Sequence, residues 1–207
     1  MSDFKKWAVF DMDDVLTDFA QSSYETMVRL GYPDIPVSEW KNYEINNIYG
    51  LKSHQEFIDM MINEDILSNS KIKEGVIETL QSFKDAGFHT GILTARGWHP
   101  YAKKLTDNFV EEHHLPIDKV VIAGHHTQGK LFYASEFFQE GEIVCYVDDS
   151  PKHIKDFKNA GLYSHLMRTS WIQDEEVVGL SQVHSIREYK DKVFKELGLT
   201  TNRRNKP

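Results

Sequence analysis

Four apolar runs recur along the chain, and stretches with helical periodicity separate them. The runs are WAVFDM (7–12), HTGILTA (89–95), KVVIAG (119–124) and EIVCYVDD (142–149). Short continuous apolar runs are typical of strands that are buried on both faces of a sheet. Because strands that alternate with helices are joined by parallel crossovers, the sequence predicts an α/β fold with a Rossmann-like, doubly wound parallel sheet. LYSHLM (162–167) is expected to add a fifth strand.

The intervening stretches have the apolar spacing of amphipathic helices. In KEGVIETLQSFKDAG (73–87), the apolar residues Val76, Ile77, Leu80 and Phe83 are expected on one side, and Gly87 is suited to end the helix. PYAKKLTDNFVEEHHL (100–115), LFYASEFFQEG (131–141) and PKHIKDFKNAG (151–161) show the same pattern. Near the end of the chain, QVHSI (182–186) is expected to form an edge strand and REYKDKVFKELG (187–198) a closing helix.

Residues 18–71 depart from this alternation. They contain no strong strand pattern, and Pro33 and Pro36 interrupt their helical stretches. A connection of this length without secondary structure is uncommon in a compact domain. We therefore predict a small helical cap at 18–71, inserted after the first strand into a core domain formed by 1–17 and 72–207.

Three carboxylates, Asp11, Asp13 and Asp14, directly follow the first apolar run. Carboxylates repel one another and resist burial unless they are paired or bind a cation. Ligands of open parallel sheets bind beyond the carboxyl ends of the strands. The other strand ends supply Thr94, the acidic pair in YVDDS (146–150) and, after a short loop, Lys130. The sequence thus predicts a site with a cation, a hydroxyl donor and one ammonium group.

These four motifs, in this order, resemble those of the haloacid dehalogenase superfamily of phosphohydrolases. VFDMDDVLTD matches its Asp-x-Asp motif, GILT its Thr motif, Lys130 its Lys motif and VDDS its acidic motif. Receiver domains share the Asp, Thr and Lys residues. However, their acidic pair lies on the first strand and the phosphorylated Asp on a later one, so the order here argues against them.

The resemblance implies a role for each catalytic residue. Asp11 would attack phosphorus and form an aspartyl-phosphate, and Asp13 would act as general acid and then general base. An acid at position 13 is typical of the branches that cleave phosphate esters. Thr94 and Lys130 would stabilise the transferring group. The rival Lys119 precedes its strand and is expected at the wrong end of the sheet. Arg96 is predicted to bind a substrate anion, with a surface salt bridge as the alternative.

Magnesium is the cofactor that the resemblance implies. Its ligands would be the Asp11 carboxylate, the carbonyl oxygen of Asp13 and an acid of VDDS, with Asp149 as the direct ligand and Asp148 as an outer or alternate one. His153 stands where a further acid sometimes occurs. The adjacent pairs His113–His114 and His125–His126 lack the spacing of zinc ligands, so no zinc site is expected.

The substrate is predicted to be a small phosphorylated molecule. The opening motif and the insertion look similar to the deoxyribonucleotidase branch, which implies nucleoside monophosphates. Aromatic residues of the insertion could stack on a base or form the cap's own core; they are Tyr24, Trp40, Tyr43, Tyr49 and Phe57. A sugar or metabolite phosphatase, a mutase and a non-catalytic module that binds phosphorylated ligands are the alternatives.

Composition limits the partners and the compartment. A net charge of −8 disfavours long nucleic acids, whose binding requires neutralisation of phosphates by basic residues. No signal peptide or membrane-spanning run is recognisable, so no membrane partner is expected. The single cysteine, Cys145, allows no intrachain disulfide and indicates a cytoplasmic protein.

Overall fold

The first strand lies inside a parallel sheet, flanked on both sides by strands from later in the chain. The computed structural model describes residues 4–124 and 129–199. Within them, six strands pair in the order β3-β2-β1-β4-β5-β6. Every pair is parallel. The strands are β1 (Lys5–Phe10), β2 (His89–Thr94), β3 (Lys119–Ile122), β4 (Gly141–Asp148), β5 (Ser164–Met167) and β6 (Gln182–Val183). The predicted α/β fold is confirmed, and β6 is the predicted edge strand.

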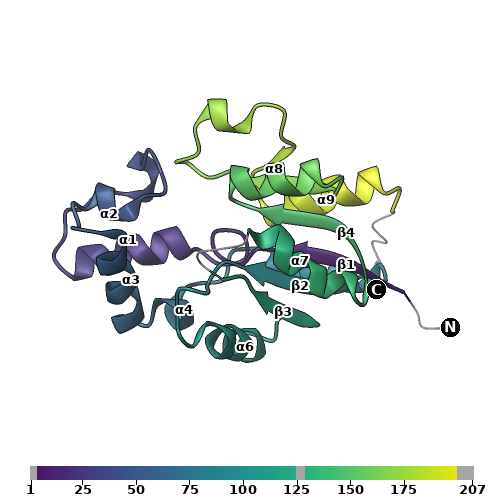
Figure 1. Cartoon of the computed structure of the whole chain (residues 1–207), viewed down its shortest axis with the longest axis horizontal. Coiled ribbons are helices and arrows are strands. Elements are labelled where there is room, and N and C mark those ends of the chain that lie inside the picture. Colours follow the sequence, from purple (N-terminus) through teal and green to yellow (C-terminus); the bar gives the residue numbers. More distant parts are fainter. Residues whose placement is uncertain (1–3, 125–128, 200–207) are drawn as a thin grey trace, which may run out of the picture.

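Helices cover both faces of the sheet (Figure 1), because successive side chains of a strand point to opposite faces. From β1, Phe10 packs in edge-to-face contacts against Phe83 of α5 (Val76–Asp85) and Tyr189 of α9 (Ile186–Glu196). Trp7 points the other way and packs against Phe137 of α7 (Lys130–Phe138). The remaining core helices are α6 (Ala102–Glu112) and α8 (Pro151–Asn159).

The insertion between β1 and α5 is helical, as predicted. It contains α1 (Phe19–Arg29), the short 3-10 helix η1 (Val37–Glu39), α2 (Ile45–Ile48), α3 (His54–Asn63) and α4 (Ile66–Asn69). Figure 1 shows α1, α2 and α3 beside the sheet rather than on one of its faces. Buried residues of these helices, such as Met27 and Phe57, share a hydrophobic cluster with Trp7 and Phe137. Because the insertion and the core share this cluster, packing does not mark a boundary between them, and the division into a core and a cap at residues 18 and 71 stays a prediction.

Because all six strands are parallel, their carboxyl ends lie at one edge of the sheet. Asp11 follows β1, Thr94 ends β2 and Asp148 ends β4. Lys130 is the first residue of α7. The topology thus brings together side chains from four separate motifs. None of the helices within 4–124 and 129–199 combines the length and the apolar character needed to cross a bilayer.

A substitution at Gly141, the first residue of β4, tests how closely the central strands pack. A Cβ atom on Gly141 would collide with the backbone carbonyl of Lys5, whereas one on Gly129 would meet, among the described residues, only Asp156 Oδ2, at 3.8 Å. We expect Gly141→Ala to lower the free energy of unfolding by at least about 2 kcal/mol, because backbone cannot give way as a flexible side chain can. Gly129→Ala should change it by less than about 1 kcal/mol. Urea denaturation measures both, and equal stabilities of the two variants would contradict this account.

Candidate active site

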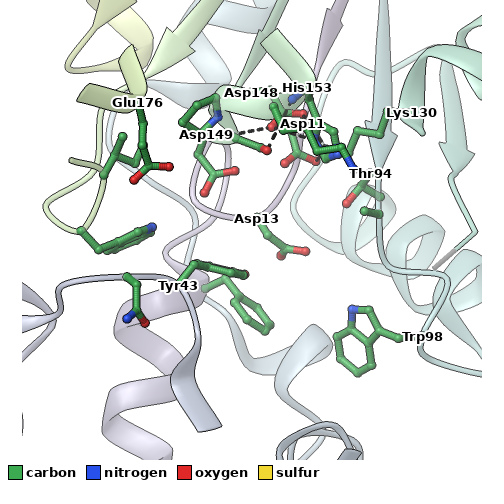
Figure 2. Close-up of a pocket in the computed structure, with 18 of the residues that line it drawn as sticks. Asp11, Asp13, Tyr43, Thr94, Trp98, Lys130, Asp148, Asp149, His153 and Glu176 are labelled. Atoms are coloured by element: carbon green, nitrogen blue, oxygen red, sulfur yellow. Dashed lines mark hydrogen bonds and ion pairs between the residues drawn. The ribbon is translucent and has the colours of Figure 1, made fainter. Parts of the chain in front are cut away.

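Asp11 and Lys130 form a buried ion pair at the carboxyl edge of the sheet (Figure 2). The backbone N–H of Asp11 donates a hydrogen bond of 2.8 Å to the Val147 carbonyl, which fixes the end of β1 beside β4. The Lys130 ammonium lies 2.7 Å from Asp11 Oδ1 and 2.7 Å from Asp148 Oδ2. All three side chains are buried. The Lys130 ammonium therefore links the ends of two neighbouring strands, β1 and β4.

Burial and charge shift the protonation of this pair in definable directions. Burial raises the pKa of Asp11 to about 6; the Lys130 charge opposes this rise, and the Asp148 carboxylate adds to it. Burial alone would lower the pKa of Lys130, but the carboxylates of Asp11 and Asp148 raise it above its ordinary value. Lys130 is accordingly an ammonium at neutral pH, and Asp11 is mostly ionised there.

The two acids at the end of β4 have different surroundings. Asp148 accepts hydrogen bonds from Lys130, from the Tyr146 hydroxyl and, at 2.7 Å, from the Ser150 backbone N–H. The His153 ring nitrogen Nδ1 lies 3.2 Å from both of its oxygens. Although burial opposes ionisation, Lys130 and His153 hold the pKa of Asp148 below its ordinary value. Nearly all of the hydrogen-bonding capacity of Asp148 is thus used within the protein.

Asp149 faces the open space beside this cluster. Burial, together with the carboxylates of Asp148, Asp14 and Asp11, raises the pKa of Asp149 well above its ordinary value. A carboxylate that neighbouring acids surround gains most from a cation. Asp149 is therefore better suited than Asp148 to bind a metal ion directly.

The donor set fits a hard divalent cation. One oxygen each of Asp11, Asp148 and Asp149 can lie within 4.8 Å of the others. Asp11 Oδ1 is buried, and the Lys130 ammonium lies 2.7 Å from it. Ligands that are all oxygen atoms suit magnesium, which takes one or two carboxylates and keeps several waters. The Asp13 carboxylate is not part of this group, so a role of Asp13 as a ligand would fall to its carbonyl oxygen, as the family resemblance implies.

Asp13 is held by Arg96. Its carboxylate lines the cavity and accepts two hydrogen bonds from the Arg96 guanidinium, at 2.6 and 2.9 Å. The Arg96 side chain is fully buried, which rules out the surface salt bridge that was the alternative from sequence. Arg96 is not among the described residues that line the cavity. Its predicted contact with a substrate anion therefore stays a prediction, while its contact with Asp13 is a feature of the structure.

Thr94 lies at the end of β2 and also faces the cavity. Its hydroxyl is buried and finds no hydrogen-bond partner among the described residues. Most buried hydroxyls in proteins are hydrogen-bonded, so an open one in a cavity is available to a ligand oxygen. The structure thus brings the predicted catalytic residues Asp11, Asp13, Thr94 and Lys130 to one cavity.

The cavity has a volume of about 460 Å³ and lies between the carboxyl edge of the sheet and the predicted cap. From the 18–71 segment, Tyr43 and Phe57 line it, whereas Trp40 and Tyr49 are buried against each other. Tyr24 instead donates a hydrogen bond to Asp34. Trp40 and Tyr49 therefore belong to a buried core, whereas a ligand contact of Tyr43 and Phe57 stays a prediction.

Part of the cavity wall was missed by sequence reasoning. Trp98 lies beyond β2, and Trp171, Ile172 and Glu176 lie beyond β5. The Trp171 ring packs 5.8 Å from Trp40 and 5.9 Å from Tyr43, centroid to centroid. In the sequence, the feature that could have identified these residues is their position after strands, where ligands of parallel sheets are expected to bind.

The remaining candidates lie elsewhere. Lys119 begins β3 and donates hydrogen bonds to Glu140 and to the Glu136 carbonyl, at the opposite edge of the sheet from Asp11. The His113 ring packs against Phe109 in α6, with centroids 4.3 Å apart. The pair His125–His126 lies outside the described residues.

The fold has counterparts among solved structures. A predicted phosphatase from Clostridium acetobutylicum superposes with a TM-score of 0.64 at 17% identity, over 93% of this chain and 99% of that one. A putative phosphatase from Clostridium difficile gives a TM-score of 0.64 at 12% identity, over 93% and 100%. A putative beta-phosphoglucomutase from Thermotoga maritima gives 0.60 at 18% identity, over 94% and 100%.

No curated protein matches the sequence at a significant level. The family model of haloacid dehalogenase-like hydrolases, however, matches residues 5–161, a span that runs from β1 through α8 and includes Asp11, Thr94, Lys130 and Asp149. The chain belongs to the haloacid dehalogenase-like hydrolases and is an enzyme of that family.

Proposed function

We propose that this enzyme is a magnesium-dependent phosphomonoester hydrolase that acts through an aspartyl-phosphate on Asp11. One observation carries the proposal: a buried carboxylate, paired with a lysine, shares a cavity with two further acids and an open hydroxyl. A nucleophile, a place for a cation and donors for phosphoryl oxygens are the parts that phosphoryl transfer requires.

In the first step, an Asp11 oxygen attacks phosphorus, and the bond between phosphorus and the ester oxygen breaks. Asp13 gives its proton to the departing oxygen, so that an alcohol leaves. In the second step, water attacks the phosphorus of the aspartyl-phosphate and loses a proton to Asp13. Inorganic phosphate leaves and the Asp11 carboxylate is restored. Each step therefore moves one proton through Asp13, and the cycle returns both acids to their starting states.

The other residues stabilise charge. Lys130 lies 2.7 Å from Asp11 Oδ1 and can neutralise the anion that builds up as the phosphoryl group transfers. The Thr94 hydroxyl can donate to a phosphoryl oxygen. A magnesium ion held by Asp11 and Asp149 would supply a Lewis acid that reduces the repulsion between the carboxylate and the phosphate. Asp148 would orient Lys130 rather than bind the ion, because its oxygens already accept several hydrogen bonds.

We infer a nucleoside monophosphate as the first candidate substrate. Aromatic side chains line the cavity from both sides, Tyr43 and Phe57 from the insertion and Trp98 and Trp171 from the core. Flat apolar walls favour a planar ring such as a nucleobase. A sugar phosphate is the second candidate, because Asn42, His54 and Glu176 also line the cavity and can hydrogen-bond to hydroxyl groups. A cytoplasmic location, which the single cysteine favours, is part of the same proposal.

The nucleophile is tested with Asp11→Asn and p-nitrophenyl phosphate in the presence of magnesium. An amide cannot form the aspartyl-phosphate, so we expect turnover to fall at least about 1,000-fold while the circular dichroism spectrum is kept. Asp107→Asn is the matched control, since Asp107 lies outside the cavity and forms an ion pair with Lys103 in α6. Activity of Asp11→Asn within tenfold of the parent would refute the assignment. If the parent chain shows no turnover with or without magnesium, a non-catalytic binding module is favoured instead.

Magnesium binding is expected to weaken as the pH falls. In the metal-free protein the pKa of Asp11 is about 6 because of burial, and the pKa of Asp149 is also raised. The ion binds carboxylates, so protons compete with it below about pH 6, and the apparent affinity should be at least about tenfold lower at pH 5 than at pH 7. Calorimetric titration with magnesium at pH 5 and pH 7 measures this. Equal affinity at the two pH values would show that the carboxylates do not form the site.

The substrate class is tested with Tyr43→Ala. Tyr43 is partly exposed and lines the cavity, so we expect the Ala variant to keep the fold. We expect kcat/KM to fall about tenfold for nucleoside monophosphates through the loss of stacking, and less than threefold for glycerol phosphate. Tyr101→Ala, at an exposed position outside the cavity, is the control. An equal fall for both substrates, or faster turnover of sugar phosphates than of all nucleotides by the parent, would overturn the nucleotide assignment.

A further inference from the structure

Arg96 is an unusual residue in this site because its charge is buried and used entirely within the protein. The side chain has 0% exposure. Nε donates to Asp13 Oδ2 at 2.9 Å and Nη2 to Asp13 Oδ1 at 2.6 Å. Nη1 donates to the Thr106 hydroxyl of α6 at 3.2 Å. The guanidinium is thus anchored on a core helix and directs both arms of its fork at one carboxylate.

The geometry fixes the orientation of Asp13 as well as its charge. A bidentate guanidinium–carboxylate pair holds the carboxylate plane, which a single ammonium contact does not. Within the described part of the chain, the one other side chain that donates to the Asp13 carboxylate is Thr17, whose hydroxyl lies 3.4 Å from Oδ1. Without Arg96 the carboxylate could rotate about its side-chain bonds. Stability alone is a weak reason for such a pair, because well-packed apolar residues often replace buried ion pairs without loss.

The held carboxylate still reaches the cavity. The Asp13 side chain is 17% exposed, and in Figure 2 it lies between the Asp11 cluster and Tyr43. A carboxylate offers about four lone-pair sites, and the fork of Arg96 occupies two of them. Asp13 can therefore exchange a proton with a molecule in the cavity while Arg96 continues to hold it.

We propose that Arg96 is a positioning residue that aims the Asp13 carboxylate at the ester oxygen and at the attacking water, and that Arg96 does not itself bind substrate. The inference rests on the proposed function, because it requires Asp13 to transfer protons. It replaces the contact with a substrate anion that the sequence suggested for Arg96.

Proton transfer matters unequally for different steps and substrates, which makes the role of Arg96 measurable. Formation of the aspartyl-phosphate from p-nitrophenyl phosphate releases a stable phenolate and needs little help from an acid. An alkyl phosphate releases an alkoxide that must be protonated, and hydrolysis of the intermediate needs a base for water. Loss of positioning should slow the last two processes and spare the first.

The experiment compares Arg96→Met and Arg96→Lys with the parent chain in rapid-mixing and steady-state assays. For Arg96→Met with p-nitrophenyl phosphate, we expect a burst of about one phenolate per site. The burst rate constant should lie within about threefold of the parent value, and the steady rate should fall about 100-fold. With glycerol phosphate kcat should fall about 100-fold, while KM changes less than threefold. Arg96→Lys keeps the charge but offers one donor nitrogen in place of the two that contact Asp13, so it should recover part of the loss.

Two controls separate positioning from other roles. Thr106→Val removes only the anchor of Nη1 and should cost less than about fivefold in kcat. Because the two residues act as a unit, adding Arg96→Met to Asp13→Asn should cause no further loss. Thermal unfolding confirms that each variant is folded. If Arg96→Met does not fold, the kinetic comparison is made with Arg96→Lys alone.

Three outcomes would overturn the proposal. A rise in KM with kcat unchanged would make Arg96 a substrate ligand. An equal fall of the burst rate constant and the steady rate with p-nitrophenyl phosphate would make Arg96 a structural residue only. Turnover by the parent chain would leave the proposed function standing in both of these cases. Absence of turnover by the parent would instead refute the proposed function and, with it, the role of Arg96.

Discussion

The buried contact of the Lys130 ammonium with Asp11 and Asp148 is the interaction on which the site depends. An isolated ammonium or carboxylate at this depth would be strongly destabilising, and removing one partner of a buried pair typically costs about 3–5 kcal/mol. Here one cation lies 2.7 Å from an oxygen of each of two carboxylates, so the three charges make burial tolerable together. The arrangement retains a net negative charge beside Asp149, which is the condition under which a divalent cation binds.

This arrangement is possible only because the sheet is parallel. In a parallel sheet every strand ends at the same edge, so residues separated by long stretches of sequence become neighbours. The backbone hydrogen bond from Asp11 to Val147 aligns the ends of β1 and β4. Asp11 and Asp148, which are 137 positions apart in number (148 − 11), can then share one lysine. Helix α7 brings that lysine because its first residue faces the same edge.

Two basic residues form ion pairs with different members of the acidic cluster. Lys130 neutralises the acids at the ends of β1 and β4, whereas Arg96 holds Asp13 on the side of the cavity nearer to Tyr43. Their chemistry suits these tasks, because an ammonium acts as a point charge between two acceptors and a guanidinium fixes one carboxylate plane. The segment after β5 completes the cavity: Ser170 donates to the Val37 carbonyl and Gln173 to the Lys41 carbonyl, so the core and the insertion meet beside Trp171.

The sequence by itself determined the fold class and the residues at the strand ends. The period and length of the apolar runs are local properties, and they were sufficient to predict the strands and the helices. The residues at or soon after the strand ends could then be read directly from the sequence; they are Asp11, Thr94, Lys130 and Asp149. Only the tertiary structure decided which groups touch. In the structure Arg96 donates to Asp13, and Lys130 donates to Asp148. Tyr43 lines the cavity whereas Trp40 is buried, and Trp98 and Trp171 form part of the cavity wall. These contacts join residues far apart in sequence, and their partners are selected by the packing of strands and helices, which no local pattern encodes.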